Sequence, residues 1–200
     1  LNVDLDTGFL SVLRSQIGPL VGGFWFEIEV VGPHSPYFNE TEHLLKKDGM
    51  PLTVSGRRFW DMEDPWVIEH LTKEVIGTLK EGGFGYLKVD YNDTIGMGCD
   101  GGDSLGDGLY KKIAATQSFF RKIKEEIPEI VIENCSSGGH RLVSSMMELA
   151  SQASFSDAHE TTAIPLIAAN MHRVIRPEQS QIWAVLRAGD SRERIIYSLA

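Results

Sequence analysis

Strand-like and helix-like segments alternate along this chain, and this alternation limits its fold more than any other feature. The segment 64–80 begins with Asp64-Pro65, a strong helix start, carries an apolar stripe at helical spacing, and stops at Gly82-Gly83. A strand-like segment, 83–92, follows directly. A second amphipathic helix, 109–126, and a strand, 129–135, repeat the order. Strands joined through helices pair in parallel, so the sequence predicts an α/β protein.

The strand 83–92 carries three polar residues at its carboxyl end. Lys88, Asp90 and Asn92 occupy alternate positions and therefore share one face of the strand. The carboxyl ends of parallel strands are where substrates bind in α/β proteins. The charge of Lys88 favours the ionised form of Asp90, which would then be an oriented nucleophile or base. A strand-end ion pair without chemistry is the alternative interpretation.

Polar residues also lie at or near the ends of other expected strands, which favours a barrel over a doubly wound sheet. The further expected strands are 21–31, 55–62, 153–157 and 181–186, and the further expected helices are 7–18, 142–151, 163–174 and 192–200. The polar residues are Glu29, Arg57, Asp90, Cys135 and Asp157. The six expected strands are two fewer than a closed (β/α)8 barrel has.

Composition narrows the class of protein. With 200 residues, 42% of them hydrophobic, the chain has the size of one domain, 1–200, with a buried core. The net charge of −9 argues against nucleic acid or an anionic membrane as a partner. No apolar run is long enough to span a bilayer, and no basic leader is visible, so we expect a cytoplasmic protein.

Several kinds of site are disfavoured by their missing motifs. The glycine-rich stretch 96–108 lacks both the phosphate-loop ending and the dinucleotide fingerprint. No nucleophile elbow of a serine hydrolase is present. His159, Glu160 and Asp157 form one local cluster with metal-ligand residue types, but no paired histidine spacing supports it. We therefore expect neither a metal nor a cofactor.

Two carboxylates at the ends of separate strands remain, Asp90 and Asp157. Asp157 has few cationic neighbours, and burial beside Phe155 would raise its proton affinity. One carboxylate kept ionised and another kept partly protonated is the pattern of a glycosidase. Taken alone, Asp157 fits the N-cap of a helix better than a catalytic role.

Five motifs, in order along the chain, resemble glycoside hydrolase family 36. They are Trp-Phe-Glu-Ile-Glu at 25–29, Gly-Arg at 56–57, Lys-Val-Asp-Tyr-Asn at 88–92, Cys-Ser-Ser-Gly-Gly-His-Arg at 135–141 and Ser-Asp-Ala-His-Glu at 156–160. The resemblance implies a retaining α-galactosidase on a (β/α)8 barrel that acts on α-galactoside oligosaccharides. It implies Asp90 as the nucleophile and Asp157 as the acid/base. The implied sugar-binding residues are Trp25, Arg57, Lys88, Asn92, Cys135 and Gly138.

The chain also departs from the family pattern. Ile28 replaces a usual Pro, and Ser154 stands where the family often has Trp. Arg58 follows Arg57 directly, so the two arginines could exchange roles. In family terms the chain covers about strands two to seven, without the N-terminal β-sandwich, the C-terminal domain, or an Asp-Asp pair that holds galactose. We therefore expect the isolated chain to be a poor, association-prone catalyst. Three alternative functions stay open: an α-N-acetylgalactosaminidase, a transglycosylase and a non-catalytic carbohydrate-binding fragment. A homo-oligomer also stays open.

Overall fold

The computed structural model describes residues 22–158, 163–181 and 187–199. The predicted helix 7–18 lies outside these residues, as do His159 and Glu160 and all of the predicted strand 181–186 except Gln181. The described chain forms two compact units. The first unit contains the residues up to Leu87 together with Tyr91–Ile130, and the second contains Lys88–Asp90 and the residues from Val131 onward. The single domain 1–200 stays a prediction.

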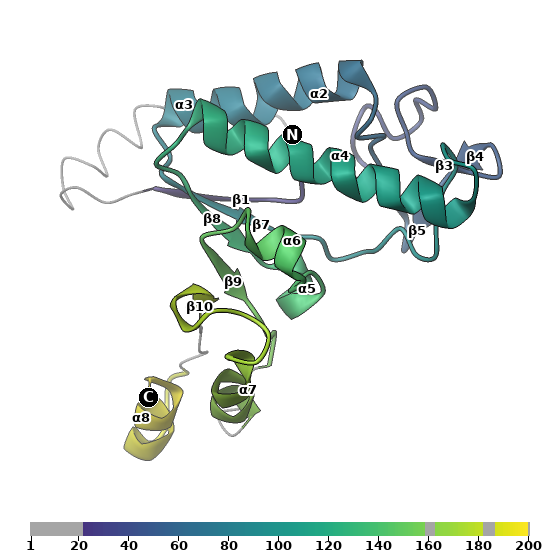
Figure 1. Cartoon of the computed structure of the whole chain (residues 1–200). Helices are drawn as coiled ribbons and strands as arrows, with labels where there is room; N and C mark the ends of the chain where they lie inside the picture. The colour runs from purple at the N-terminus through teal and green to yellow at the C-terminus, as the bar shows by residue number, and fades with distance from the viewer. Residues whose placement is uncertain (1–21, 159–162, 182–186, 200) are drawn as a thin grey trace. The chain divides into compact units, whose positions relative to one another are not determined.

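Two long helical segments of the first unit lie side by side and run in the same direction (Figure 1). The predicted helix 64–80 is confirmed as a continuous helical segment made of α2 (Pro65–Leu71), the π-helical η1 (Thr72–Gly77) and α3 (Thr78–Gly82). Asp64 caps its start by accepting a hydrogen bond from the Trp66 N–H, and Gly83 ends it in the left-handed conformation, with φ +60°. α4 (Leu105–Glu126) runs beside it, and an ion pair between Lys80 and Glu126 joins the two.

The predicted strand 21–31 is divided into two strands that lie in different sheets. β1 (Gly23–Phe26) lies next to β7 (Tyr86–Val89), and its Phe24 ring packs on Phe84 at 5.5 Å between centroids. β2 (Val30–Val31) instead joins an antiparallel sheet in the order β2–β6–β5, with β5 at Thr53–Val54 and β6 at Arg57–Phe59. A turn at residues 28–29 separates the strands and breaks the expected alternation.

The predicted strand 55–62 is present as the shorter β6, but it does not join the parallel sheet. β6 pairs in antiparallel fashion with both neighbours, because Ser55 and Gly56 form a tight hairpin turn with positive φ angles of 50° and 75°. A second small hairpin, β3 (Lys46–Lys47) with β4 (Met50–Pro51), belongs to the same unit. These hairpins cover a core cluster that includes Leu45, Phe59 and Tyr91.

The second unit holds a parallel sheet whose strands follow chain order. The end of β7 is followed by β8 (Val131–Asn134), β9 (Gln152–Ser154) and β10 (Ser180–Gln181). Asn134 of β8 pairs with Ala153 of β9, and Ser180 of β10 pairs with the same residue from the other side. The helical segments are α5 (Ser136–Gly139), α6 (Ser144–Met147), α7 (Ala163–Met171), η2 (Pro177–Gln179) and α8 (Arg192–Leu199). Neighbouring parallel strands in chain order are the arrangement of a (β/α)8 barrel.

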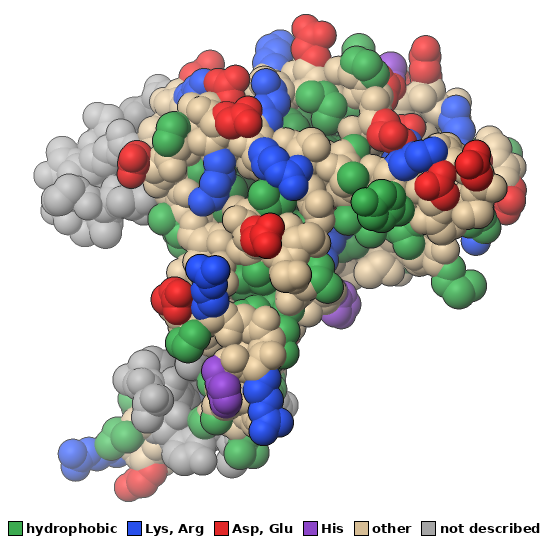
Figure 2. Space-filling view, viewed as in Figure 1, with side chains coloured by type: hydrophobic (Ala, Val, Ile, Leu, Met, Phe, Trp, Pro, Cys, Tyr) green, Lys and Arg blue, Asp and Glu red, His purple; other side chains and the backbone are tan. Residues whose placement is uncertain are grey.

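The described surface carries charged side chains of both signs (Figure 2). Figure 2 shows basic and acidic side chains interspersed over the face in view, without a broad basic patch. Among the described residues, no helix is both long and apolar enough to cross a membrane.

Candidate active site

Asp90 follows β7 directly, and a backbone N–H fixes its carboxylate. The side chain is buried, with 8% of its surface exposed. The N–H of Ser137 donates to its Oδ1 at 2.9 Å. A carboxylate that is buried and bound in this way has a fixed direction, which is what a nucleophile at the end of a strand requires.

The turn that provides this N–H has an unusual backbone. Ser136, Ser137 and Gly138 have consecutive positive φ angles of 47°, 53° and 70°. Two of these residues are serines, for which the left-handed region is costly. Such conformations persist only where surrounding contacts hold them, and they concentrate at functional sites. The turn lies immediately after β8, at the end of the sheet that also carries Asp90.

Gly138 brings this same turn against Asp157. A Cβ atom on Gly138 would lie 2.5 Å from the Asp157 backbone nitrogen and 2.9 Å from its carboxyl carbon, Cγ. Only glycine fits at this distance. One short turn therefore contacts both predicted catalytic carboxylates, Asp90 through Ser137 and Asp157 through Gly138.

Asp157 itself lies beyond β9, as predicted, but it is not buried. Its neighbour Phe155 is buried, whereas Asp157 is exposed. The expectation that burial would surround this carboxyl was wrong, because the strand ends at Ser154 and residues 155–158 leave the sheet. The alternative role of Asp157 as a helix N-cap would involve the backbone of residues 159–162. These residues lie outside the described chain.

Lys88 forms its ion pair with Glu133 of β8. The Nζ atom lies 2.9 Å from Glu133 Oε1 and donates to Ser154 Oγ at 3.2 Å. Burial works against the charged ammonium, but the hydrogen bond and charge of Glu133, with smaller effects from Cys135 and Asp90, raise the pKa of Lys88 above its usual value. Lys88 therefore interacts with the charge of Asp90, although Glu133 is its direct partner.

Sequence reasoning missed Glu133. The signal that could have found it is an acid within the apolar strand Val131-Ile132-Glu133-Asn134, because a buried acid needs a cationic partner. The residue is 2% exposed. Its pairing with a lysine from another strand could not be read from the sequence alone.

Cys135 lies beside this cluster as a neutral thiol. Its side chain is buried, and burial is the main cause that raises the pKa of the thiol, with further upward effects from Asp90 and Asp157. A thiol of this kind is neither a nucleophile nor a ready metal ligand at neutral pH. Its N–H donates to the carbonyl of Val89, which ties the start of the turn to β7.

In the first unit, Arg57 and Asn92 meet at a shared acid. Arg57 Nη1 contacts both carboxylate oxygens of Glu27 at 3.0 Å and lies 3.2 Å from Asp93 Oδ2. The Asn92 side-chain amide also donates to Glu27. Glu27, which the sequence analysis did not select as a site residue, therefore organises two of the predicted sugar-binding residues.

Arg58 and Trp25 are placed differently. Arg58 donates to the carbonyl of Phe38 and to Thr53 Oγ1, and its guanidinium lies 4.4 Å from the centre of the Phe38 ring. These partners anchor Arg58 on the antiparallel sheet. Trp25 of β1 is 54% exposed, so its ring is available to a ligand.

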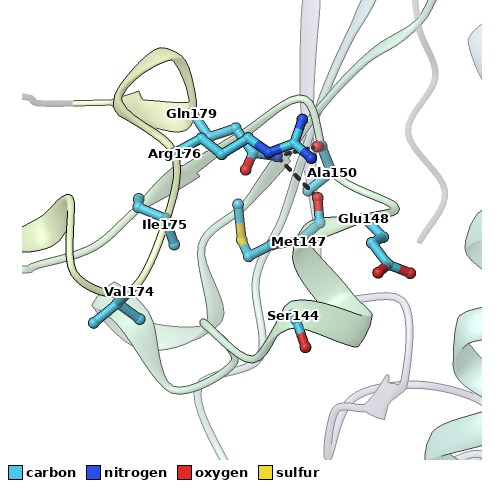
Figure 3. Close-up of a pocket in the computed structure, with 8 residues that line it drawn as sticks. All are labelled: Ser144, Met147, Glu148, Ala150, Val174, Ile175, Arg176 and Gln179. Carbon is cyan, nitrogen blue, oxygen red and sulfur yellow. Dashed lines mark hydrogen bonds between the residues drawn. The ribbon is translucent and has the colours of Figure 1, made fainter.

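One cavity of the second unit is lined by none of the predicted site residues. It has a volume of about 410 Å³ and is lined by residues of the second unit that include Met147, Ile175 and Arg176 (Figure 3). Gln179 closes one side by donating to the carbonyls of Met147 and Ala150. Within the described ranges, no group of three His, Cys, Asp or Glu residues could hold a metal ion.

Paired acids beyond parallel strands in chain order are typical of barrel glycoside hydrolases. Comparison with known proteins gives the family: residues 9–177 match the Melibiase family model, and the chain belongs to that family. The resemblance to α-galactosidases of glycoside hydrolase family 36 is thereby confirmed.

Known relatives agree with this assignment. Alpha-galactosidase 2 of Pediococcus pentosaceus is 24% identical over 140 residues, which cover 68% of this chain and 20% of that protein. The α-galactosidase AgaA of Geobacillus stearothermophilus superposes with a TM-score of 0.75 at 19% identity, over 88% of this chain and 26% of AgaA. The α-galactosidase of Lactobacillus brevis gives 0.66 at 24% identity, over 78% of this chain and 21% of that protein. At these identities the structures show the fold, and the predicted partial (β/α)8 barrel is confirmed. The chain spans about a fifth of the length of the curated relative it matches.

Proposed function

We propose that the protein containing this chain hydrolyses terminal α-D-galactosyl residues from oligosaccharides with retention of configuration. Membership of the Melibiase family supports an α-galactoside substrate. Structures of similar α-galactosidases in complex with raffinose and with stachyose support oligosaccharides as the substrate class. The observation that carries the proposal is the left-handed turn 136–138, which contacts Asp90 on one side and Asp157 on the other.

In the first step, Asp90 forms a bond to the anomeric carbon while the glycosidic C–O bond breaks. Asp157 gives its proton to the departing oxygen, so the leaving group departs as a neutral alcohol. The Ser137 N–H keeps Asp90 Oδ1 in a fixed position during this attack. The product is a covalent galactosyl ester on Asp90.

In the second step, Asp157 acts as a base. It takes a proton from water, the water oxygen attacks the anomeric carbon, and the ester bond to Asp90 breaks. Asp90 is regenerated as a carboxylate and Asp157 as an acid. Exposure of Asp157 fits this role, because the group must meet both the leaving group and the incoming water.

The remaining site residues are proposed to bind the sugar. Lys88 lies two positions before Asp90 on the same strand, Gly138 lies in the turn, and Cys135 precedes it. Arg57, Asn92 and Trp25 are the candidates from the first unit. We assign the binding role to Arg57 rather than Arg58, because Arg57 shares Glu27 with Asn92 whereas Arg58 binds the Phe38 carbonyl. A cytoplasmic location, a homo-oligomer and weak activity of the isolated chain stay predictions.

The experiment is turnover of nitrophenyl α-galactoside and raffinose by the full-length protein, with NMR detection of the first anomer formed. We expect α-galactose first. Asp90→Ala should abolish turnover, and azide should restore it by giving a glycosyl azide of inverted configuration. β-Galactose as the first product would refute retention, and no turnover of any α-galactoside by the full-length protein would refute the proposed activity.

A further inference from the structure

Glu133, Ser154 and Gln181 form a polar network around Lys88 inside the parallel sheet of the second unit. Glu133 belongs to β8, Ser154 to β9 and Gln181 to β10. Lys88 Nζ contacts Glu133 Oε1 at 2.9 Å and Ser154 Oγ at 3.2 Å, and Ser154 also donates to Glu133 and lies 3.0 Å from Gln181 Oε1. Side chains from three consecutive strands, β7, β8 and β9, therefore meet at the ammonium group, and Gln181 of β10 joins the network through Ser154.

The Glu133 carboxylate of this network is buried, whereas the Lys88 side chain is partly exposed to solvent. Glu133 is 2% exposed and Ser154 is fully buried, whereas 28% of the Lys88 side chain is exposed. A carboxylate this deeply buried must be paired, because an isolated buried charge is very costly. Glu133 therefore holds the amine of Lys88 as a charged ammonium at a fixed place.

An ammonium group has three N–H bonds. Among the described residues, Glu133 and Ser154 receive two of them. The third N–H points away from these two acceptors. Because part of the Lys88 side chain is exposed, a ligand can reach this N–H. Asp90 lies two residues further along the same strand face, so a sugar held at Asp90 comes within reach of this ammonium.

We propose that Glu133 is a positioning residue, which acts on catalysis through Lys88 by aiming its third N–H at a hydroxyl of the sugar bound at Asp90. The proposal rests on the proposed α-galactosidase function. Glu133 itself touches no substrate, because its carboxylate is enclosed by Lys88 and Ser154.

A double-mutant cycle in the full-length protein tests this role. In Glu133→Gln the amide can still fill the site but no longer neutralises Lys88, and we expect kcat/KM for nitrophenyl α-galactoside to fall about 10- to 100-fold. In Lys88→Met the sugar contact itself is lost. Because Glu133 acts only through Lys88, Lys88→Met/Glu133→Gln should match Lys88→Met within about threefold.

Glu126→Gln is the matched control. It removes a carboxylate from the Lys80–Glu126 ion pair, which is exposed and joins α3 to α4. We expect wild-type kcat/KM for this variant, so an effect specific to Glu133 is separated from the loss of an arbitrary ion pair.

The outcomes separate the two proposals. An inactive wild-type protein overturns the proposed function. An active wild type with Glu133→Gln within twofold of it, or a double variant that shows the product of both single losses, overturns the positioning role. Should Glu133→Gln fail to fold, Glu133→Asp, which keeps the negative charge but draws it back from Lys88, is measured instead: a clear loss of kcat/KM supports the role, and kcat/KM within twofold of wild type overturns it.

Discussion

Replacement of Gly138 by alanine tests whether the turn 136–138 sets the position of Asp157. The added Cβ would lie 2.5 Å from the Asp157 nitrogen and 2.9 Å from its Cγ, where ordinary contacts begin at 3.4 Å. The backbone around Asp157 must therefore move by about 1 Å. A misplacement of this size costs about 100-fold in rate, which corresponds to about 2.7 kcal/mol.

The assay compares two substrates in the full-length protein. An activated nitrophenyl galactoside needs little proton donation, whereas raffinose has a poor leaving group and depends on the acid. We expect Gly138→Ala to lower kcat/KM about 100-fold for raffinose and clearly less for the aryl substrate. The variant should also lose about 2–5 kcal/mol of unfolding free energy from its positive φ and the crowding.

Gly49→Ala is the control for backbone strain. Gly49 has nearly the same φ, +75° against +70°, but nothing lies within 4 Å of a Cβ there. This variant should lose about 1–2 kcal/mol of stability and keep its activity. The reasoning is refuted if Gly138→Ala retains kcat/KM within threefold of Gly49→Ala on raffinose.

Three further predictions concern other residues. Thr116→Val removes a 2.8 Å hydrogen bond to the buried Glu29 and should lower the unfolding free energy by about 1–3 kcal/mol in urea titrations, whereas Thr116→Ser should not. Burial acts to raise the pKa of Asp64, but the hydrogen bonds from His43 and the Trp66 N–H outweigh it and lower the pKa below 3.8. The stabilisation from Asp64 is therefore present above about pH 3.8 and lost as the pH falls through the lower folded-state value, so Asp64→Asn should flatten the acid side of a stability–pH curve; an unchanged slope would contradict this. Trp25→Ala should leave Tm nearly unchanged, because the ring is 54% exposed, but should raise KM if the ring contacts the sugar; an unchanged KM would remove Trp25 from the site.

Sequence patterns predicted the local elements well where the signals were local. The helix over 64–80 was predicted at both ends, because the Asp64 cap, Pro65 and the stopping Gly83 act through neighbouring backbone atoms. Helix α4 starts four residues earlier than predicted, at Leu105, because Ser104 caps it by accepting from the Asp107 N–H. That capping signal was present in the sequence and was hidden by the surrounding glycines.

Predictions failed where a partner came from elsewhere in the chain. The segment 55–62 has the composition of any strand, and only its pairing with β2 and β5 makes it antiparallel. Asp157 was expected to be buried because Phe155 is apolar, but only Phe155 faces the core. The two adjacent arginines look equivalent in sequence, and their separate acceptors, Glu27 and the Phe38 carbonyl, distinguish them.

The sequence by itself determined the order of strands and helices and the presence of Asp90 and Asp157 beyond two of the strands, because periodicity and capping are properties of neighbouring residues. Tertiary structure alone decided that Lys88 pairs with Glu133 and that one turn contacts both carboxylates. Those contacts depend on which strands lie side by side and on a run of positive φ angles at Ser136 and Ser137. Serine does not favour such angles on its own, so only the packed structure can impose them.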